Sequence, residues 1–356
     1  MALDRITLAR FRNHRDSVLT GARDFNLLIG DNGAGKTNIL EALSLLAPGR
    51  GLRRAALEDI AEAGSGSFAV GADLFPDDLR LGTYTEAERP GRRLVRINGA
   101  ASSALALAEW LSASWLTPAM DGLFTGTASG RRQFMDRLAV ALDPVHAAHA
   151  ARYAAANRER NRLLAAEGPV DPAWFDSLER LLAEHGAALS RGRAALVAAL
   201  EEELAASAEE LFARPALAYQ PGGPIDPAAL YAALLAGRLE DRAARRTLIG
   251  PHRDELDVLL AAKGIPAAQS STGEQKAMLI AITLAHAALA ARGRASVLLL
   301  DEVAAHLDPV RRAALFDRLR QGQAQVWMTG TELAPFAGIA EEAAVWRVAD
   351  GRVERL

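Results

Sequence analysis

The sequence has no cysteine and no long uncharged apolar run. Without cysteine it forms no disulfides and no thiolate metal sites, a composition that suits a reducing cytosol. No stretch reaches the roughly 18 apolar residues of a membrane-spanning helix. The first residues alternate like a strand and lack the apolar block of a signal peptide. These absences predict a soluble, cytoplasmic protein without a membrane partner.

Positive and negative charges nearly balance. The formal net charge is −3 over 356 residues, so any nucleic-acid contact has to come from a local basic patch. Lysine occurs only at Lys36, Lys263 and Lys276, which singles out the one that lies in a glycine-rich loop. Half of the residues are apolar, and the length suits two domains or one domain with a large insertion.

The glycine-rich loop at residues 30–37 fits the phosphate-binding pattern Gly-x-x-x-x-Gly-Lys-Thr without a mismatch. An apolar stretch at 25–29 reads as the strand before it, and 38–43 reads as the helix after it. Its glycines let the backbone and the helix N-terminus approach a polyphosphate. The alternative is a glycine-rich turn that matches by chance. The candidate nucleotide-binding residues are Gly30, Asn32, Gly33, Ala34, Gly35, Lys36, Thr37 and Asn38.

Catalytic and metal-binding roles follow from side-chain chemistry. Lys36 offers a point charge to the β- and γ-phosphates of ATP, and Thr37 offers a hydroxyl to Mg²⁺. The apolar run from Val297 ends in Asp301 and Glu302, as the Walker B strand does. Asp301 would hold Mg²⁺, and Glu302 would orient or deprotonate the attacking water. The catalytic candidates are therefore Glu302 and Lys36, the metal ligands Thr37 and Asp301, and the cofactors ATP and Mg²⁺.

Two further segments allow a functional and a structural interpretation. Ser271, Gly273 and Gln275 resemble the Ser-x-Gly-x-Gln signature of ABC-type ATPases, which binds the γ-phosphate held by the opposite subunit. The same residues also suit a helix N-terminus with Ser271 and Glu274 as a capping box. Asp308 fits the D-loop that follows Walker B, or the N-cap of a helix at 309–319.

The order of these motifs predicts an α/β fold, an ABC-type ATPase head of the P-loop kind with an inserted helical arm. Residues 1–105 plus 247–356 would form the discontinuous ATPase lobe I, and residues 106–246 the helical insertion, the arm of lobe II. Strands are expected at 2–10, 67–74, 79–85 and 92–98, with a hairpin turn at Asn98-Gly99. Long helices are expected at 145–166 and 173–213.

At this point the chain resembles the RecF family of bacterial recombination mediators over nearly its whole length. The loop ends in a Thr-Asn-Ile-Leu-Glu-Ala run, as that family's does. The other matching strings are Phe11-Arg12-Asn13, Gly51-Leu52-Arg53 (with glycine in place of serine), Arg131–Asp136, Asn157-Arg158 with Asn161, and Gly250–Asp254. The resemblance makes Arg12 a further candidate for nucleotide contact.

The resemblance implies a weak, DNA-stimulated ATPase that forms a homodimer when ATP is bound. Each composite site would use Lys36 of one subunit and Ser271 of the other. It also implies binding to double-stranded DNA and to single-strand/double-strand junctions at gaps. There such proteins act with RecR and RecO to load RecA recombinase, in DNA replication, recombination, repair and the SOS response to DNA damage.

Departures from the ABC pattern leave rival interpretations open. No Q-loop glutamine can be assigned, and the stretch 325–331 has threonine where the switch histidine would stand, so turnover is expected to be slow. The main rival is the ATP-binding subunit of an ABC transporter, and the third candidate is a nucleotide-locked scaffold. In the arm, Arg158, Arg160 and Arg162 form either a phosphate-binding groove or a solvated face. The apolar residues Trp174, Leu178, Leu181 and Leu182 are expected in the arm's core.

Overall fold

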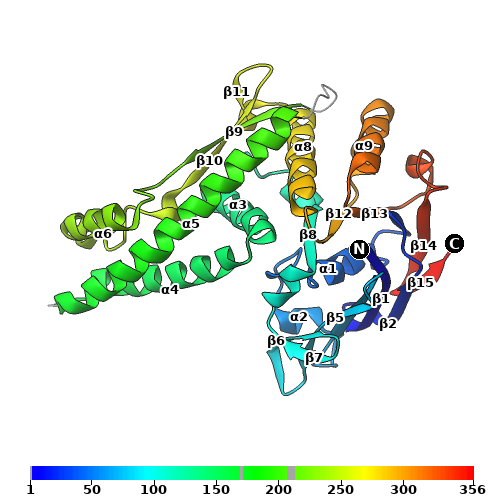
Figure 1. Cartoon of the computed structure of the whole chain (residues 1–356), viewed down its shortest axis with the longest axis horizontal. Coiled ribbons are helices and arrows are strands. Elements are labelled where there is room, and N and C mark those ends of the chain that lie inside the picture. Colours follow the sequence, from blue (N-terminus) through cyan, green and yellow to red (C-terminus); the bar gives the residue numbers. More distant parts are fainter. Residues whose placement is uncertain (1, 169–170, 207–212) are drawn as a thin grey trace. The chain divides into compact units, whose positions relative to one another are not determined.

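The chain folds into two compact units (Figure 1). The computed structural model describes residues 2–168, 171–206 and 213–356. The first unit contains residues 2–121 and 279–356 of these, and the second contains 122–206 and 213–278. None of the helices in the described ranges combines the length and the apolar character that a bilayer crossing needs.

An antiparallel sheet forms one layer of the first unit. Its strand order is β2-β1-β4-β5-β6-β7. Buried and exposed residues alternate along β5, as expected for a sheet with one face on the core. The predicted turn at Asn98 and Gly99 is confirmed, since both residues have the positive φ of a type I′ hairpin. The strands are β1 (Ala2–Phe11), β2 (His14–Thr20), β4 (Ala69–Phe75), β5 (Leu79–Glu86), β6 (Arg89–Ile97) and β7 (Ala100–Ser102).

The second sheet of this unit carries the nucleotide motifs. Its order is β15-β14-β3-β13-β12-β8, and all its pairings are parallel except that of β14 with β15. Every residue of β8, β12 and β13 is buried, which is typical of parallel strands covered on both faces. The strands are β3 (Phe25–Ile29), β8 (Leu111–Leu116), β12 (Ala295–Leu300), β13 (Gln325–Gly330), β14 (Ala343–Ala349) and β15 (Arg352–Arg355).

Helix α1 (Lys36–Ser44) and both sheets share one hydrophobic core. Ile39 and Leu43 of the helix, Leu8 of β1 and Leu299 of β12 are all fully buried in it. The rings of Trp327 and Trp346 stack in the same core, with their centroids 5.4 Å apart. The core therefore fixes the start of α1 against the carboxyl edge of the parallel strands, where ligands bind in open α/β sheets. The remaining helices of this unit are α2 (Leu57–Ile60), α9 (Pro309–Gln321) and the greater part of α8 (Thr272–Ala290).

The second unit is built around two long helices that lie side by side (Figure 1), α4 (Val145–Ala165) and α5 (Pro172–Ala206). Residues 207–212 of the expected helix at 173–213 lie outside the described residues. The other helices are α3 (Ala128–Leu142), α6 (Pro227–Ala236) and α7 (Arg238–Ala244), and the strands β9 (Pro215–Gln220), β10 (Glu255–Leu260) and β11 (Ile265–Pro266) form a small sheet.

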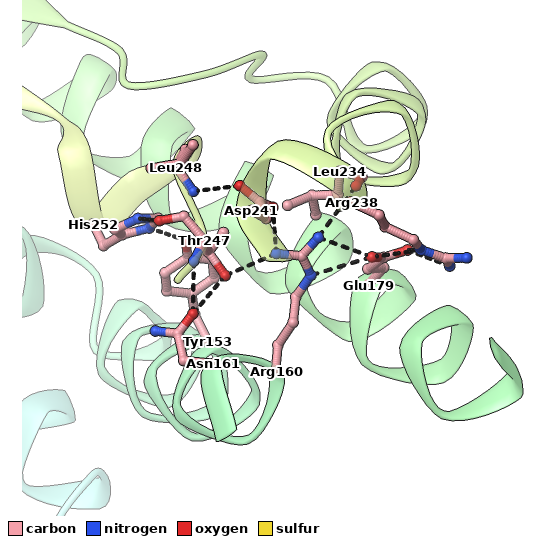
Figure 2. Close-up of polar contacts among 10 residues, drawn as sticks. All are labelled: Tyr153, Arg160, Asn161, Glu179, Leu234, Arg238, Asp241, Thr247, Leu248 and His252. Carbon is pink, nitrogen blue, oxygen red and sulfur yellow. Dashed lines mark hydrogen bonds and ion pairs between the residues drawn. The ribbon is translucent and has the colours of Figure 1, made fainter. Parts of the chain in front are cut away.

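Arg160 lies in a buried ion network within this unit (Figure 2). Its side chain is 0% exposed and reaches from α4 to Glu179 of α5 at 3.0 Å and Asp241 of α7 at 2.5 Å. It also donates to Thr247 Oγ1 at 2.9 Å and to the Leu234 carbonyl at 3.2 Å. The expected surface cluster is therefore wrong for Arg160, because this arginine links α4 to four other segments in the interior. Arg158 and Arg162 are exposed.

The unit boundaries differ from the expected ones at 105/106 and 246/247. They fall at 121/122 and 278/279, because β8 pairs with β12 in the first unit and β10 pairs with β9 in the second. The expected helical insertion consequently includes strands. Trp174 and Leu181 are 62% and 44% exposed, whereas Leu182 is 0% exposed. The expectation that all four apolar residues lie in the core is therefore wrong at Trp174 and Leu181, which lie on a more exposed part of the α5 surface than Leu182.

Candidate nucleotide-binding site

The glycine-rich loop connects β3 to α1 at the carboxyl edge of the parallel sheet. The Gly30 N–H donates to the Gly330 carbonyl at 3.2 Å, which ties the loop to the end of β13. Asn32 and Gly33 are exposed at the loop's tip, whereas Ala34 is buried. Gly35 has a φ of +115°, and a Cβ there would lie 2.7 Å from side-chain atoms of Asn13 and His14. Glycine is therefore required at position 35 by both conformation and space.

Lys36 is held against the loop that it follows. Its side chain is only 4% exposed, and its ammonium donates to the carbonyls of Gly30 at 2.5 Å and Asp31 at 2.8 Å. Burial lowers the pKa of Lys36, and the charges of Glu302 and then Asp301 oppose that shift. The next residue, Thr37, contacts Asp301 at 2.9 Å, which places the predicted Walker B acid beside the start of α1.

Three side chains and one backbone group meet at the start of α1 and the ends of β12 and β13. The Thr37 hydroxyl donates to Asp301, with distances of 2.9 and 3.1 Å to its two carboxylate oxygens. Thr329 Oγ1 donates to Asp301 Oδ1 at 2.8 Å and accepts from the Glu302 N–H at 2.9 Å. Glu302 has a φ of 55°, a left-handed conformation that costs a non-glycine residue on the order of 1 kcal/mol. The candidate metal ligands thus adjoin each other, and the candidate base follows them directly.

The two ends of α1 differ in their polar partners. The N-cap residue is Gly35, which has no side chain to cap the N-terminus, and the first turn has no acidic residue. The start of the helix is therefore suited to an anion, since the dipole favours negative charge there. Beyond the C-terminus, Arg93 of β6 donates to the carbonyls of Ala47 at 3.1 Å and Gly49 at 2.8 Å, and also to Leu45. The arginine satisfies carbonyls that follow the last turn.

A polar layer from the first sheet braces the loop. Asn13 Nδ2 donates to the Ala34 carbonyl at 3.0 Å, and the Asn38 amide donates to Asn13 Oδ1 at 2.7 Å. His14 is 0% exposed and donates through Nε2 to the Gly35 carbonyl at 3.0 Å. Burial lowers the pKa of His14, against the effect of its backbone hydrogen bonds. The candidate residue Asn38 therefore has a structural partner as well as a place beside the loop.

Arg12 forms an ion pair with an acidic residue of α1. Its guanidinium makes a two-pronged pair with Glu41 at 2.8 and 2.9 Å and donates to the Asp59 carbonyl at 2.7 Å. The Glu41 side chain is 1% exposed, and its carboxylate also accepts a hydrogen bond from the Arg53 guanidinium at 2.9 Å. The hydrogen bond to Glu41 is the main reason that the Arg12 pKa is raised. Nucleotide contact by Arg12 stays a prediction, and the structure shows its guanidinium engaged with the helix behind the loop.

The residues of the ABC-type signature form a helix start in the second unit. Ser271 and Glu274 make the capping box, because Ser271 N and Oγ each donate to Glu274 Oε2 at 2.9 Å. Lys263 and Ser271 lower the pKa of Glu274 to about 2, the Lys263 hydrogen bond having the largest effect. Gln275 is buried and donates to the Ser270 carbonyl at 2.9 Å, whereas Gly273 is exposed. The capping prediction is confirmed, and the signature role stays a prediction.

Asp308 is likewise a helix cap. Its carboxylate accepts from the N–H groups of Val310 and Arg311, each at 3.0 Å, at the start of α9. These backbone hydrogen bonds, that of Arg311 first, lower the Asp308 pKa. Half of its side chain is exposed. The N-cap interpretation is therefore confirmed, while a D-loop contact across a dimer interface is untested.

Two of the strings that resemble the RecF family meet at one buried arginine in the second unit. Arg193 of α5 donates to Asp136 at 2.8 and 2.9 Å and to Asp254 at 2.8 Å. Asp254 is 0% exposed and also accepts from Tyr219 at 2.5 Å. His252 accepts from the Tyr153 hydroxyl at 2.7 Å and donates to the Thr247 carbonyl at 2.9 Å (Figure 2). These acids and His252 therefore serve the fold of this unit.

The residues present fit ATP and Mg²⁺. The loop offers an uncapped helix N-terminus and a lysine ammonium to phosphates. Thr37 and Asp301 offer hard oxygen donors 2.9 Å apart, the ligand chemistry that Mg²⁺ prefers. Two functional partners escaped the sequence argument, Thr329 and Glu41. The sequence did contain a signal for Glu41, since this acidic residue stands among apolar residues one turn after Thr37. The role of Thr329 becomes evident only when β12 and β13 are paired.

Solved structures with the same architecture show the fold class. The recombination mediator protein RecF with ATPrS has a TM-score of 0.85 at 23% identity, covering 99% of this chain and 98% of that chain. An SMC head bound to the C-winged helix domain of ScpA has a TM-score of 0.53 at 15% identity, covering 100% and 98%. The expected fold class is thus confirmed, because the chain has the fold of an ABC-type ATPase head.

Sequence comparison identifies the family within that class. Residues 2–351 match the family described as RecF/RecN/SMC N terminal domain. The DNA replication and repair protein RecF of Mesorhizobium japonicum is 46% identical, with 99% of this chain and 97% of the relative covered. Its counterpart in Rhizobium johnstonii is 44% identical, with 99% and 98% covered. The chain belongs to the RecF family.

Proposed function

We propose that this protein binds DNA in an ATP-dependent manner and acts in recombinational repair and replication-gap processing. Its relatives are named DNA replication and repair protein RecF, and the RecF of similar fold is described as a recombination mediator in the RecFOR pathway. The observation that carries the proposal is the contact of Thr37 with Asp301 beside the buried Lys36. Family membership sets the transporter alternative aside.

ATP hydrolysis would use residues of the first unit. Lys36 binds the β- and γ-phosphates, turning from the loop carbonyls that it now contacts. Thr37 and Asp301 would hold Mg²⁺, which would neutralise negative charge on the phosphates when bound. Glu302 orients the attacking water and accepts its proton. The position of Glu302 directly after Asp301, with its N–H held by Thr329 at 2.9 Å, supports this assignment.

The nucleotide would control dimerisation. In a homodimer, the backbone and hydroxyl at Ser271, with Gly273 and Gln275, contact the γ-phosphate bound to Lys36 of the partner. Asp308 would contact the partner across the same interface. The exposure of Ser271 and Gly273 at the start of α8 supports this role, since a helix N-terminus favours anions. Hydrolysis is weak and stimulated by DNA.

DNA contact would come from local arginines, because the net charge of the chain is −3. Arg152, Arg158 and Arg162 are exposed on α4, where they suit phosphate contacts with a steep salt dependence. The substrate is double-stranded DNA at a single-strand/double-strand junction. RecR and RecO act with the protein there to load RecA, in the cytoplasm.

The testing experiment is sedimentation of the purified protein with gapped duplex DNA, with and without ATP. Wild type is expected to form dimers on DNA when ATP is present. Lys36→Ala loses these dimers, whereas Glu302→Gln keeps them, since it retains the residues that bind ATP and lacks the base. Monomers that respond neither to ATP nor to DNA would reject the proposal, and dimers that persist in Lys36→Ala would reject the nucleotide's role.

A further inference from the structure

We propose that Thr329 is the residue that positions Glu302 and Asp301 for ATP hydrolysis. The inference rests on the proposed ATPase function and assigns to β13 a part in it. Thr329 lies at the carboxyl end of this strand, is 0% exposed, and contacts both acidic residues of the site. It does so from a different strand, so its hydroxyl sets the position of the acids relative to the parallel sheet.

The hydrogen-bond roles of the Thr329 hydroxyl are fixed by its two partners. An ionised carboxylate only accepts, so the single hydroxyl proton points to Asp301 Oδ1 at 2.8 Å. A backbone N–H only donates, so a lone pair of the same oxygen receives Glu302 N at 2.9 Å. One oxygen therefore couples the carboxylate of the candidate metal ligand to the backbone of the candidate base.

Glu302 needs such a partner because its backbone is strained. Its φ of 55° lies in the left-handed region, and strained residues persist only where their surroundings fix them. Thr329 provides that constraint from a rigid element, since all six residues of β13 are buried and the strand pairs with β12 and β3 on its two sides. The left-handed turn directs the chain away from β12 immediately after Asp301, which sets where the Glu302 carboxylate can lie.

Side-chain replacements can separate this role from simple packing. Serine retains a hydroxyl on Cβ and can both donate to Asp301 and accept from Glu302. Valine has the shape and strand preference of threonine but can do neither. Loss of a polar partner behind catalytic or metal-binding carboxylates typically lowers activity about 10- to 100-fold. A role in packing alone predicts the opposite order, with valine tolerated better than serine.

The experiment measures kcat and KM for ATP hydrolysis in wild type, Thr329→Val and Thr329→Ser. Valine is expected to lower kcat about 10- to 100-fold with little change in KM, and serine is expected to restore most of it. Thr283→Val is the matched control, since Thr283 is also buried at 2% exposure but donates only within its own helix, to the Leu279 carbonyl at 2.7 Å. Binding of a fluorescent ATP analogue verifies that each variant is folded.

A second measurement tests whether Thr329 acts through Glu302. In a Glu302→Gln background the valine substitution should lower the residual rate far less than in wild type. Equal kcat in wild type and Thr329→Val, or equal losses for valine and serine, would overturn the positioning role while leaving the ATPase intact. Wild-type protein that binds ATP without hydrolysing it would remove both the ATPase function and this inference. Should Thr329→Val fail to bind the analogue, Thr329→Ser alone decides, because a kcat loss of 10-fold or more despite the retained hydroxyl would refute the inference.

Discussion

Arg160 offers a quantitative test of the second unit, because the arginine is fully buried and neutralises two buried acids. Replacement by methionine keeps much of its volume and removes the charge. Glu179 retains Arg238, with contacts of 2.6 and 3.0 Å, whereas Asp241 retains the Leu248 N–H at 2.9 Å but loses its cation. A buried carboxylate deprived of its partner costs about 3–5 kcal/mol. We therefore expect Arg160→Met to lower the free energy of unfolding by that amount.

Urea unfolding followed by circular dichroism measures the loss, and hydrogen exchange in α4 and α5 locates it in the second unit. Arg158→Met, an exposed change on the same helix, serves as the control and should alter stability by less than about 0.5 kcal/mol. Adding Asp241→Asn to Arg160→Met should recover about 1–3 kcal/mol, because the unpaired charge is gone. Strict additivity of the two changes, or a loss below about 1 kcal/mol for Arg160→Met, would refute the reasoning.

Three other predictions concern the first unit. Glu302→Gln should lower ATP hydrolysis about 10²- to 10⁴-fold while retaining ATP binding in an equilibrium assay; unchanged hydrolysis would disqualify Glu302 as the base. Because burial lowers the His14 pKa below 6.5, the neutral ring contributes stability that is present above about pH 6.5 and lost as the pH falls through the folded-state pKa. Thermal melting of wild type from about pH 7.5 down to about pH 5 should show this loss of stability, and His14→Gln should lack it. The same pH dependence of the melting temperature in both proteins would show that His14 is not responsible. The turn at Gly351 contacts the nucleotide loop, because the Gly351 N–H donates to the Ala34 carbonyl at 3.0 Å. Gly351→Ala should destabilise the protein by about 1–3 kcal/mol and weaken ATP binding, since its φ is +73° and a Cβ would lie 1.9 Å from the Asn13 carbonyl oxygen. Wild-type affinity and melting temperature would show that this turn does not support the loop.

The nucleotide site was predictable where its information is local. The loop, the acid pair and the strand and helix beside them each need only a few neighbouring residues. In contrast, β8 was missed because Ser112 and Ser114 interrupt its apolar run and it precedes a helical region. Both serines are buried with distant partners, the Ala290 carbonyl at 2.9 Å and His286 at 2.8 Å. Contacts between residues so far apart in the chain cannot be predicted from a short segment of sequence.

Arg160 was misjudged for the same reason. It lies in a polar run between Arg158 and Arg162, and a charged run of this kind is usually a solvated face. Its two acidic partners are 19 and 81 residues further along the chain. Their burial depends on how α5 and α7 pack against α4, which is a property of the folded unit. Local pattern thus located the chemistry of this protein but not the ion pairs that hold its second unit together.

The position of β3 in its sheet has a consequence for synthesis of the chain. This strand leads into the nucleotide loop near the N-terminus, yet its two neighbours are β13 and β14, about 300 residues later. On a translating ribosome, β3 emerges long before the two strands with which it pairs. A nascent chain that lacks β13 and β14 therefore cannot form the parallel pairings on either side of β3.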